Sequence, residues 1–330
     1  MFNESNTSLK ILEYFDTKYG QLTAPVGLFK ACAVVSSQLA WPRLSILTVA
    51  PTRQFKSSTS RDVEAMFPEN YVIHAGSDFT MHRLFKQTNG DVDRKCIFIN
   101  DGTLLLRSKS TRGRDRLVNG LAELIADGEY LYGDYQNAFA VKGGCTAVAN
   151  MTLEAFARYE ESLLSMTFLE RFLTLHYKMP PKEQRYFYET REERAKDAAK
   201  ILPKEKIKIR PFKIANLKEH RKTLKTLAQD FSAMSLRSFL GCADQVEALA
   251  ISHAVLNERF WLCEDDLHVL RMARDYIVNQ LSPVKSRILQ LYEQGRNQHD
   301  ICLLLNKDYK SYRPHVSRVL REAKLRGIIE

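Results

Sequence analysis

The sequence predicts an α/β fold built on a parallel sheet. Segments with the apolar, β-branched composition of buried strands alternate with segments of helical spacing. The expected strands are residues 44–50, 71–75, 95–101, 145–152 and 173–177. Alternation of this kind is typical of a parallel sheet, in which ligand chemistry gathers at the carboxyl ends of the strands.

Changes in composition divide the 330 residues into four parts. An N-terminal helical lead-in, with helices expected over 8–19 and 25–39, is followed by the α/β domain, a charged helical region and a small basic unit. The expected bounds of these four parts are 1–43, 44–181, 182–281 and 282–330.

The composition is that of an ordinary globular protein with an excess of positive charge. The net charge of +10 and the pI near 9.2 favour an anionic partner such as nucleic acid. None of the six cysteines forms a C-x-x-C pair, which indicates free thiols in a reducing compartment. We expect a cytoplasmic protein without a membrane partner, because no signal peptide and no apolar run of about 18 residues is evident.

The stretch 44–60 resembles a phosphate-binding loop. An apolar strand leads into a turn, and Lys56-Ser57 opens a helix whose N-terminus favours anions. In such loops the lysine reaches the outer phosphates and the hydroxyl holds Mg²⁺. The spacing is degenerate, because glycines are expected at Ala50 and Phe55. The residues expected to contact phosphate are Thr52, Arg53, Gln54, Phe55, Lys56, Ser57 and Ser58.

A second predicted strand ends at an acidic residue, which a nucleotide-binding site requires at this position. Asn100-Asp101 follows an apolar run, and a carboxylate there orients Mg²⁺ or the attacking water. The alternative is a turn-forming Asn-Asp-Gly after an ordinary strand. A cap at Ser77 or Asp78 predicts the start of the helix that precedes this strand.

A third strand, 145–152, carries Asn150 where we expect the chain to leave the sheet. A carboxamide there can position a water against a γ-phosphate, and the alternative is that Asn150 caps the next helix. A helix over 111–127 and a hairpin over 128–144 precede this strand. The helix expected after it, 153–172, closes with Glu170-Arg171-Phe172.

The remaining segments are helical. Ser235-Leu236-Arg237 is expected to start the first helix of 234–280. Helices over 285–292, 299–305 and 312–326, followed by a strand-like end at 327–329, predict a winged helix-turn-helix. The basic face of its last helix favours DNA contact, with protein contact as the alternative. The expected DNA-binding residues are Arg313, His315, Arg318, Arg321 and Lys324.

In their order, these motifs resemble an AAA+ ATPase over roughly residues 20–280. The resemblance is to the branch with a β-hairpin before the Asn-bearing strand, which includes minichromosome-maintenance helicases and the Holliday-junction branch-migration motor. It implies a P-loop AAA+ core with a helical lid, binding ATP and Mg²⁺ in a homo-oligomer, commonly a hexameric ring. The hairpin would point into the pore or at a partner.

The resemblance also implies roles for single residues. Lys56 would bind the β- and γ-phosphates, Ser57 and Asp101 would hold Mg²⁺, and Asn100 would assist Asp101. The other implied roles are those of Asn150 as the sensor, Arg171 as an arginine finger acting on the neighbouring subunit and Arg237 as the lid arginine.

These roles describe a DNA-associated ATPase: a ring-forming motor, or a nucleotide-switched assembly factor in replication, recombination or a mobile element. The absent loop glycines and the absent Glu beside Asp101 leave a second hypothesis, a non-hydrolysing DNA-binding regulator or adaptor. A third hypothesis is a remodeller of a protein partner.

Overall fold

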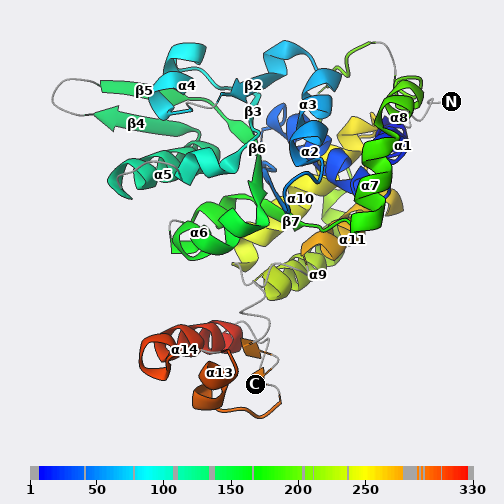
Figure 1. Cartoon of the computed structure of the whole chain (residues 1–330). Helices are drawn as coiled ribbons and strands as arrows, with labels where there is room; N and C mark the ends of the chain where they lie inside the picture. The colour runs from blue at the N-terminus through cyan, green and yellow to red at the C-terminus, as the bar shows by residue number, and fades with distance from the viewer. Residues whose placement is uncertain are drawn as a thin grey trace.

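The computed structural model describes residues 7–325 except 41, 77–78, 107–110, 134–137, 166, 203–204, 211, 236–237, 278–287, 290, 293 and 306. Figure 1 shows a central sheet with helices on both faces, and a small helical unit near the C-terminus. The predicted α/β class is confirmed.

The sheet has five parallel strands in the order β2-β3-β6-β1-β7. Their bounds are β1 (Ile46–Ala50), β2 (Val72–Ala75), β3 (Lys95–Ile99), β6 (Cys145–Thr152) and β7 (Leu173–His176). All five predicted strands are present. β1 is buried along its whole length because helices cover both faces, which explains its unbroken apolar sequence.

Two layers of helices enclose the sheet (Figure 1). One face carries α4 (Met81–Thr88), α5 (Thr111–Asp127) and α6 (Leu153–Ser165). The other face carries α1 (Thr7–Tyr19), α2 (Ala24–Ser37) and α3 (Lys56–Met66). The expected lead-in is therefore part of the main core, and α2 is buried along almost its entire length.

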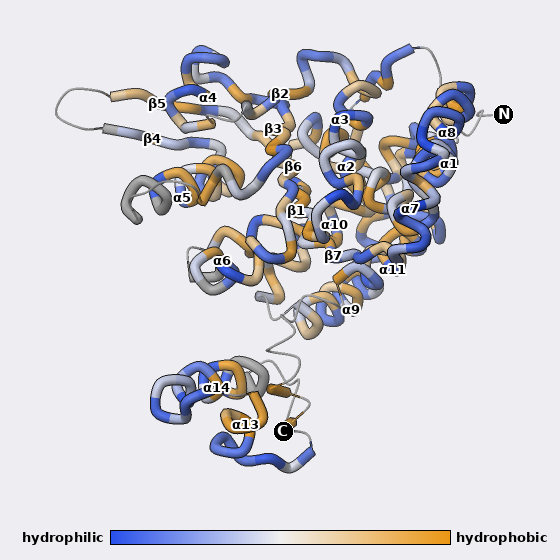
Figure 2. Tube along the Cα trace, viewed as in Figure 1, coloured by the Kyte–Doolittle hydropathy of each residue, from blue (hydrophilic) through white to orange (hydrophobic). Residues whose placement is uncertain are grey.

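The charged region after the sheet forms helices that extend the α2 layer. They are α7 (Pro181–Glu189), α8 (Arg191–Ala198), α9 (Leu217–Ser235), α10 (Phe239–Leu256) and α11 (Glu264–Ile277). Figure 2 shows α8 as mostly hydrophilic. By length and composition alone α10 could cross a membrane, contrary to the expectation that no segment could, but 61% of it is buried inside the fold.

A buried charge cluster joins α10 to α11. The Asp266 carboxylate accepts bonds from His253 Nδ1 at 2.6 Å, from the Arg259 guanidinium at 2.8 and 3.0 Å, and from the Cys263 amide at 2.8 Å. Asp266 is fully buried, so these donors replace its water shell.

Between β3 and β6 the chain forms the predicted hairpin. Strands β4 (Glu129–Gly133) and β5 (Ala138–Lys142) pair antiparallel. An aromatic cluster covers one face of the hairpin, where Phe139 lies 5.0 Å from Tyr132 and 5.2 Å from Phe85 of α4, measured between ring centroids. These contacts attach the hairpin to the helical layer at that end of the sheet.

Three expected helix boundaries are wrong. Helix α4 begins at Met81 with Thr80 as its cap, and Ser77 and Asp78 lie outside the described residues. The helix after β6 ends at Ser165 and is followed by a short 3₁₀ helix, η3 (Phe168–Arg171). Ser235 ends α9 instead of starting a helix, because Ser238 is the residue whose hydroxyl accepts the capping bond of α10.

The C-terminal unit has its own small core. Helices α13 (Gln298–Leu304) and α14 (Tyr309–Leu325) pack through Ile301, Val316 and Leu320. The strand-like end expected at 327–329 lies outside the described residues, so the wing stays a prediction.

Candidate functional site

The turn from β1 to α3 contains two non-glycine residues in the left-handed conformation. Arg53 and Phe55 both have φ of +59°, the left-handed region that usually needs glycine. The Phe55 ring packs on Tyr19 of α1 with centroids 5.0 Å apart. This contact supports a conformation that is unfavourable for a non-glycine residue.

Gln54 anchors the turn to the chain that follows β7. Its side-chain carbonyl accepts a bond from the Met179 amide at 2.8 Å, and its amide donates to the Met179 carbonyl at 3.3 Å. The Tyr177 hydroxyl donates to the Gln54 carbonyl, and Gln184 of α7 donates to the Arg53 carbonyl at 3.0 Å. Gln54 is buried, so in this structure its side chain holds the turn in place.

Lys56 lies inside the turn. Its ammonium donates to the carbonyl of Ala50 at 2.7 Å and to that of Pro51 at 2.5 Å. Burial lowers the pKa of Lys56 from 10.5 to about 8, although the carboxylates of Glu154 and Asp101 act in the opposite direction. Both acids follow sheet strands at the same edge, so an ammonium and two carboxylates share this end of the sheet.

The start of α3 meets the end of β3. The Ser57 hydroxyl donates to the Asn100 carbonyl at 2.8 Å. Asp101 accepts bonds from the Thr103 amide at 3.0 Å and the Thr103 hydroxyl at 2.5 Å, and so caps the short helix η2 (Gly102–Leu106). The structure therefore brings Lys56, Ser57 and Asp101 to one edge, and it also gives Asp101 the turn-forming role that the sequence left open.

Asn150 does not end its strand. It pairs with Thr48 in the sheet register, two residues before β6 ends, and it is buried. Its amide nitrogen donates to Ser60 Oγ at 2.9 Å and to Asn100 Oδ1 at 3.5 Å. The expectation that it lies where the chain leaves the sheet is wrong, and the residue that caps α6 is Thr152, whose hydroxyl accepts from the Ala155 amide at 3.2 Å.

Lys30, which is not among the residues expected from the sequence, lies in the middle of α2 with 0% exposure. Its amine donates to Asn150 Oδ1 at 2.9 Å and to three oxygens in the first turns of α3. Those oxygens are Lys56 O at 2.8 Å, Thr59 Oγ1 at 2.8 Å and Ser60 Oγ at 3.1 Å. The available signal was one lysine in an otherwise apolar helix, APVGLFKACAVVSS. Glu154, in the first turn of α6, is not among the expected residues either.

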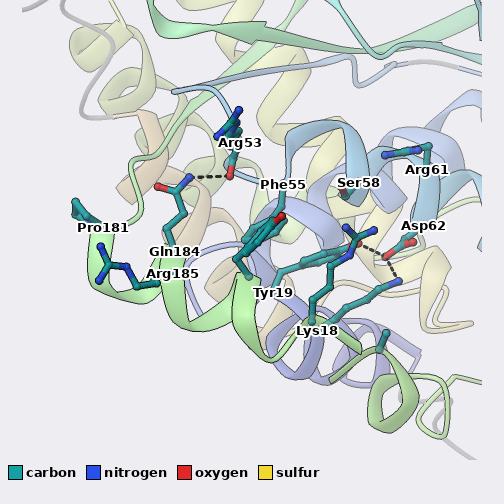
Figure 3. Close-up of a pocket in the computed structure, with 13 residues that line it drawn as sticks. Lys18, Tyr19, Arg53, Phe55, Ser58, Arg61, Asp62, Pro181, Gln184 and Arg185 are labelled. Atoms are coloured by element: carbon teal, nitrogen blue, oxygen red, sulfur yellow. Dashed lines mark hydrogen bonds and ion pairs between the residues drawn. The ribbon is translucent and has the colours of Figure 1, made fainter. Parts of the chain in front are cut away.

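A cavity of about 980 Å³ opens beside the turn, between α1, α3, α7 and α8 (Figure 3). Tyr19 and Phe55 lie side by side in it. Its basic lining residues are Lys18, Arg53, Arg61, Arg185 and Arg191. Asp62 is the one acid among the described residues that line it, and Lys18 neutralises it at 2.7 Å. The cavity therefore has aromatic surface and an excess of positive charge.

The other predicted ATP-site residues lie apart from the turn or at its surface. Thr52 is exposed, and Ser58 lines the cavity. Arg171 is exposed at the end of η3, where the neighbouring Glu170 accepts a bond from the Ser238 hydroxyl at 2.6 Å. Arg237 lies outside the described residues.

Helix α14 presents three of the predicted DNA-binding residues. Arg313, Arg318 and Arg321 are exposed, and His315 is half-buried, 3.2 Å from the Arg318 guanidinium. The side chain of Lys324 lies outside the described residues.

No group of three or more His, Cys, Asp or Glu side chains that could hold a metal ion occurs in the part of the chain that the structure describes. A scan against protein-family models finds no family that matches this chain, and a search of curated proteins finds no relative.

Proposed function

We propose that this chain binds a nucleoside triphosphate, taken as ATP, at the turn 51–57 and acts as a DNA-associated ATPase of the AAA+ type. The observation that carries the proposal is the position of Lys56. Its ammonium lies within a strand-turn-helix, held by the carbonyls of Ala50 and Pro51, beside a hydroxyl and two carboxylates. A phosphate oxygen can replace those carbonyls as acceptor and gains a full charge interaction.

The residues at the turn fit a magnesium triphosphate. The N-terminus of α3 favours an anion, and Ser57 and Asp101 are the oxygen donors that would hold Mg²⁺. The metal, when bound, neutralises charge on the phosphates. Lys56 then orients the outer phosphates, and Arg53 and Phe55 give the turn its left-handed backbone.

The adjacent cavity fits the rest of a nucleotide. Tyr19, Phe55 and Tyr188 offer aromatic surface for a base. Arg53 and Arg61 approach from the turn and from α3, and their charge complements the phosphates.

Three further observations support the AAA+ assignment. The hairpin lies between β3 and β6, η3 packs beside the start of α10, and the chain ends in a basic helical unit. Arg171 is exposed, as an arginine finger that acts on a neighbouring subunit must be. We therefore include a homo-oligomeric ring, in which hydrolysis uses Arg171 in trans, and DNA contact through α14.

Equilibrium binding of a fluorescent ATP analogue tests the proposal. Lys56→Met should weaken binding by at least about tenfold, since a charge-assisted contact is lost. Lys86→Met, an exposed lysine of α4, is the matched control and should bind as the wild type does. Equal affinity in the two variants contradicts the proposal.

A second function, nucleotide binding without turnover, is favoured by two observations. Thr103 engages the Asp101 carboxylate, and Asn150 is buried short of the sheet edge. Steady-state phosphate release with and without DNA separates the two functions. If the wild type releases phosphate and Asp101→Asn abolishes this release, the ATPase is favoured. If the wild type releases no phosphate with or without DNA, the non-hydrolysing regulator is favoured.

A further inference from the structure

The Lys30 amine is buried among neutral oxygen atoms. No carboxylate within the described residues hydrogen-bonds it, and its four oxygen neighbours are a carbonyl, two hydroxyls and a carboxamide. Burying an ammonium among neutral groups is unfavourable relative to an apolar side chain of the same shape. The stability of the fold alone does not account for a lysine at this position.

The charged groups that act on this amine both come from α3. Burial lowers the pKa of Lys30 and the Lys56 ammonium lowers it further, while Glu64 raises it. An anion at the turn would offset the repulsion between the two lysines, because it attracts both. The two lysines therefore belong to one electrostatic site, in which an anion at the turn favours the charged form of each.

The contacts of Lys30 join three elements of the proposed ATP site. The amine holds the carbonyl of Lys56 itself, at 2.8 Å, and the Asn150 carboxamide of β6 at 2.9 Å. Asn150 donates in turn to the Asn100 side chain, and the Asn100 carbonyl accepts from Ser57. A chain of hydrogen bonds thus runs from α2 through β6 and β3 back to the start of α3.

We propose that Lys30 is a positioning residue of the phosphate site: its amine lies behind the turn, holds the first turn of α3 and Asn150 in place, and is kept charged by a bound polyphosphate, which it then attracts. This inference rests on the proposed function. The proposed role of Lys30 differs from a purely structural one, because the contribution of Lys30 to binding grows with the charge of the ligand.

The test compares AMP, ADP and ATP binding by calorimetry at pH 7 for wild type, Lys30→Met and the control Lys86→Met. Lys30→Met removes the charge and keeps most of the volume. We expect ATP binding to weaken by about tenfold, as one charge in an environment of intermediate dielectric predicts, and AMP binding by about threefold or less. The control should leave all three affinities unchanged.

Lys30→Gln is the second variant, because it retains a donor for the Asn150 and Lys56 oxygens if Lys30→Met does not fold. For Lys30→Gln as well, we expect the loss of affinity to increase from AMP to ATP. An equal loss for all three nucleotides, or no loss, overturns the inference while leaving the proposed function intact. A wild-type protein that binds none of the nucleotides overturns both.

Discussion

The titration of Lys56 gives the most direct test of the proposed site. Lys56 has a pKa of about 8 in the fold, so the free protein is nearly fully charged there at pH 7 and mostly neutral at pH 9. A bound triphosphate keeps the ammonium charged. The proton must therefore be taken up on binding at high pH, and this weakens the apparent affinity.

The size of the effect follows from linkage. For a group of pKa 8 that must be charged in the complex, the affinity should fall roughly tenfold between pH 7 and pH 9. Fluorescence titration of an ATP analogue at pH 7, 8 and 9 measures this. Lys56→Met should bind weakly and with a shallower pH dependence, because it has no proton to gain at this position.

Through Lys56, a rise in pH should increase the stability of the fold while it lowers the affinity for ATP. Because the pKa of Lys56 falls from 10.5 in the unfolded chain to about 8 in the fold, the unfolded chain binds the proton more tightly. The free energy of unfolding should therefore increase as the pH rises above 8, relative to that of Lys56→Met in urea titrations. ATP affinity that stays within about twofold from pH 7 to pH 9 refutes the reasoning.

Three other predictions concern separate parts of the chain. Asp266→Ala should lower the free energy of unfolding by about 3–5 kcal/mol in urea titrations, because it leaves Arg259 buried without its partner. Burial acts to raise the pKa of Asp266, but the bonds from His253 and its other donors bring it below its ordinary value. This stabilisation should therefore be present above about pH 4 and be lost as the pH falls further, and an acid transition that is the same in wild type and Asp266→Ala would count against it. Arg171→Ala should reduce phosphate release by about 10³-fold with ATP affinity nearly unchanged, and unaltered turnover would exclude the finger role. Arg321→Ala should weaken DNA binding and lower the slope of log K against log salt by about 1, and an unchanged slope would remove this residue from the interface.

Local patterns in the sequence were sufficient for the elements of the fold. The five strands, the hairpin and helix α5 occur where composition and periodicity predict them. The helix that begins at Lys56 and the Asn100-Asp101 end of β3 are also where they were expected. These properties depend on residues that are close along the chain. The alternation of apolar and polar residues, the β-branched side chains and the turn-forming residues can all be read from the sequence.

The position of side chains within the sheet required the tertiary structure. The sequence suggests that Asn150 lies where the chain leaves the sheet, but the register places it beside Thr48, beneath α2 and α3. Phe55 occupies a left-handed position that its residue type does not suggest, and a ring from α1 supports it. Backbone conformation at such a site follows from contacts made by distant segments.

The sequence alone determined a parallel α/β core with a lysine-bearing turn, because strand and helix signals are short-range. Only the tertiary structure decided which polar groups meet. It brings the Lys30 amine within 2.9 Å of the Asn150 carboxamide oxygen, 120 residues away in the sequence. It also places the Gln54 side chain in hydrogen-bond contact with Met179, 125 residues away. Such pairs form because a buried polar atom must find a partner wherever packing brings one, and no local pattern records that partner.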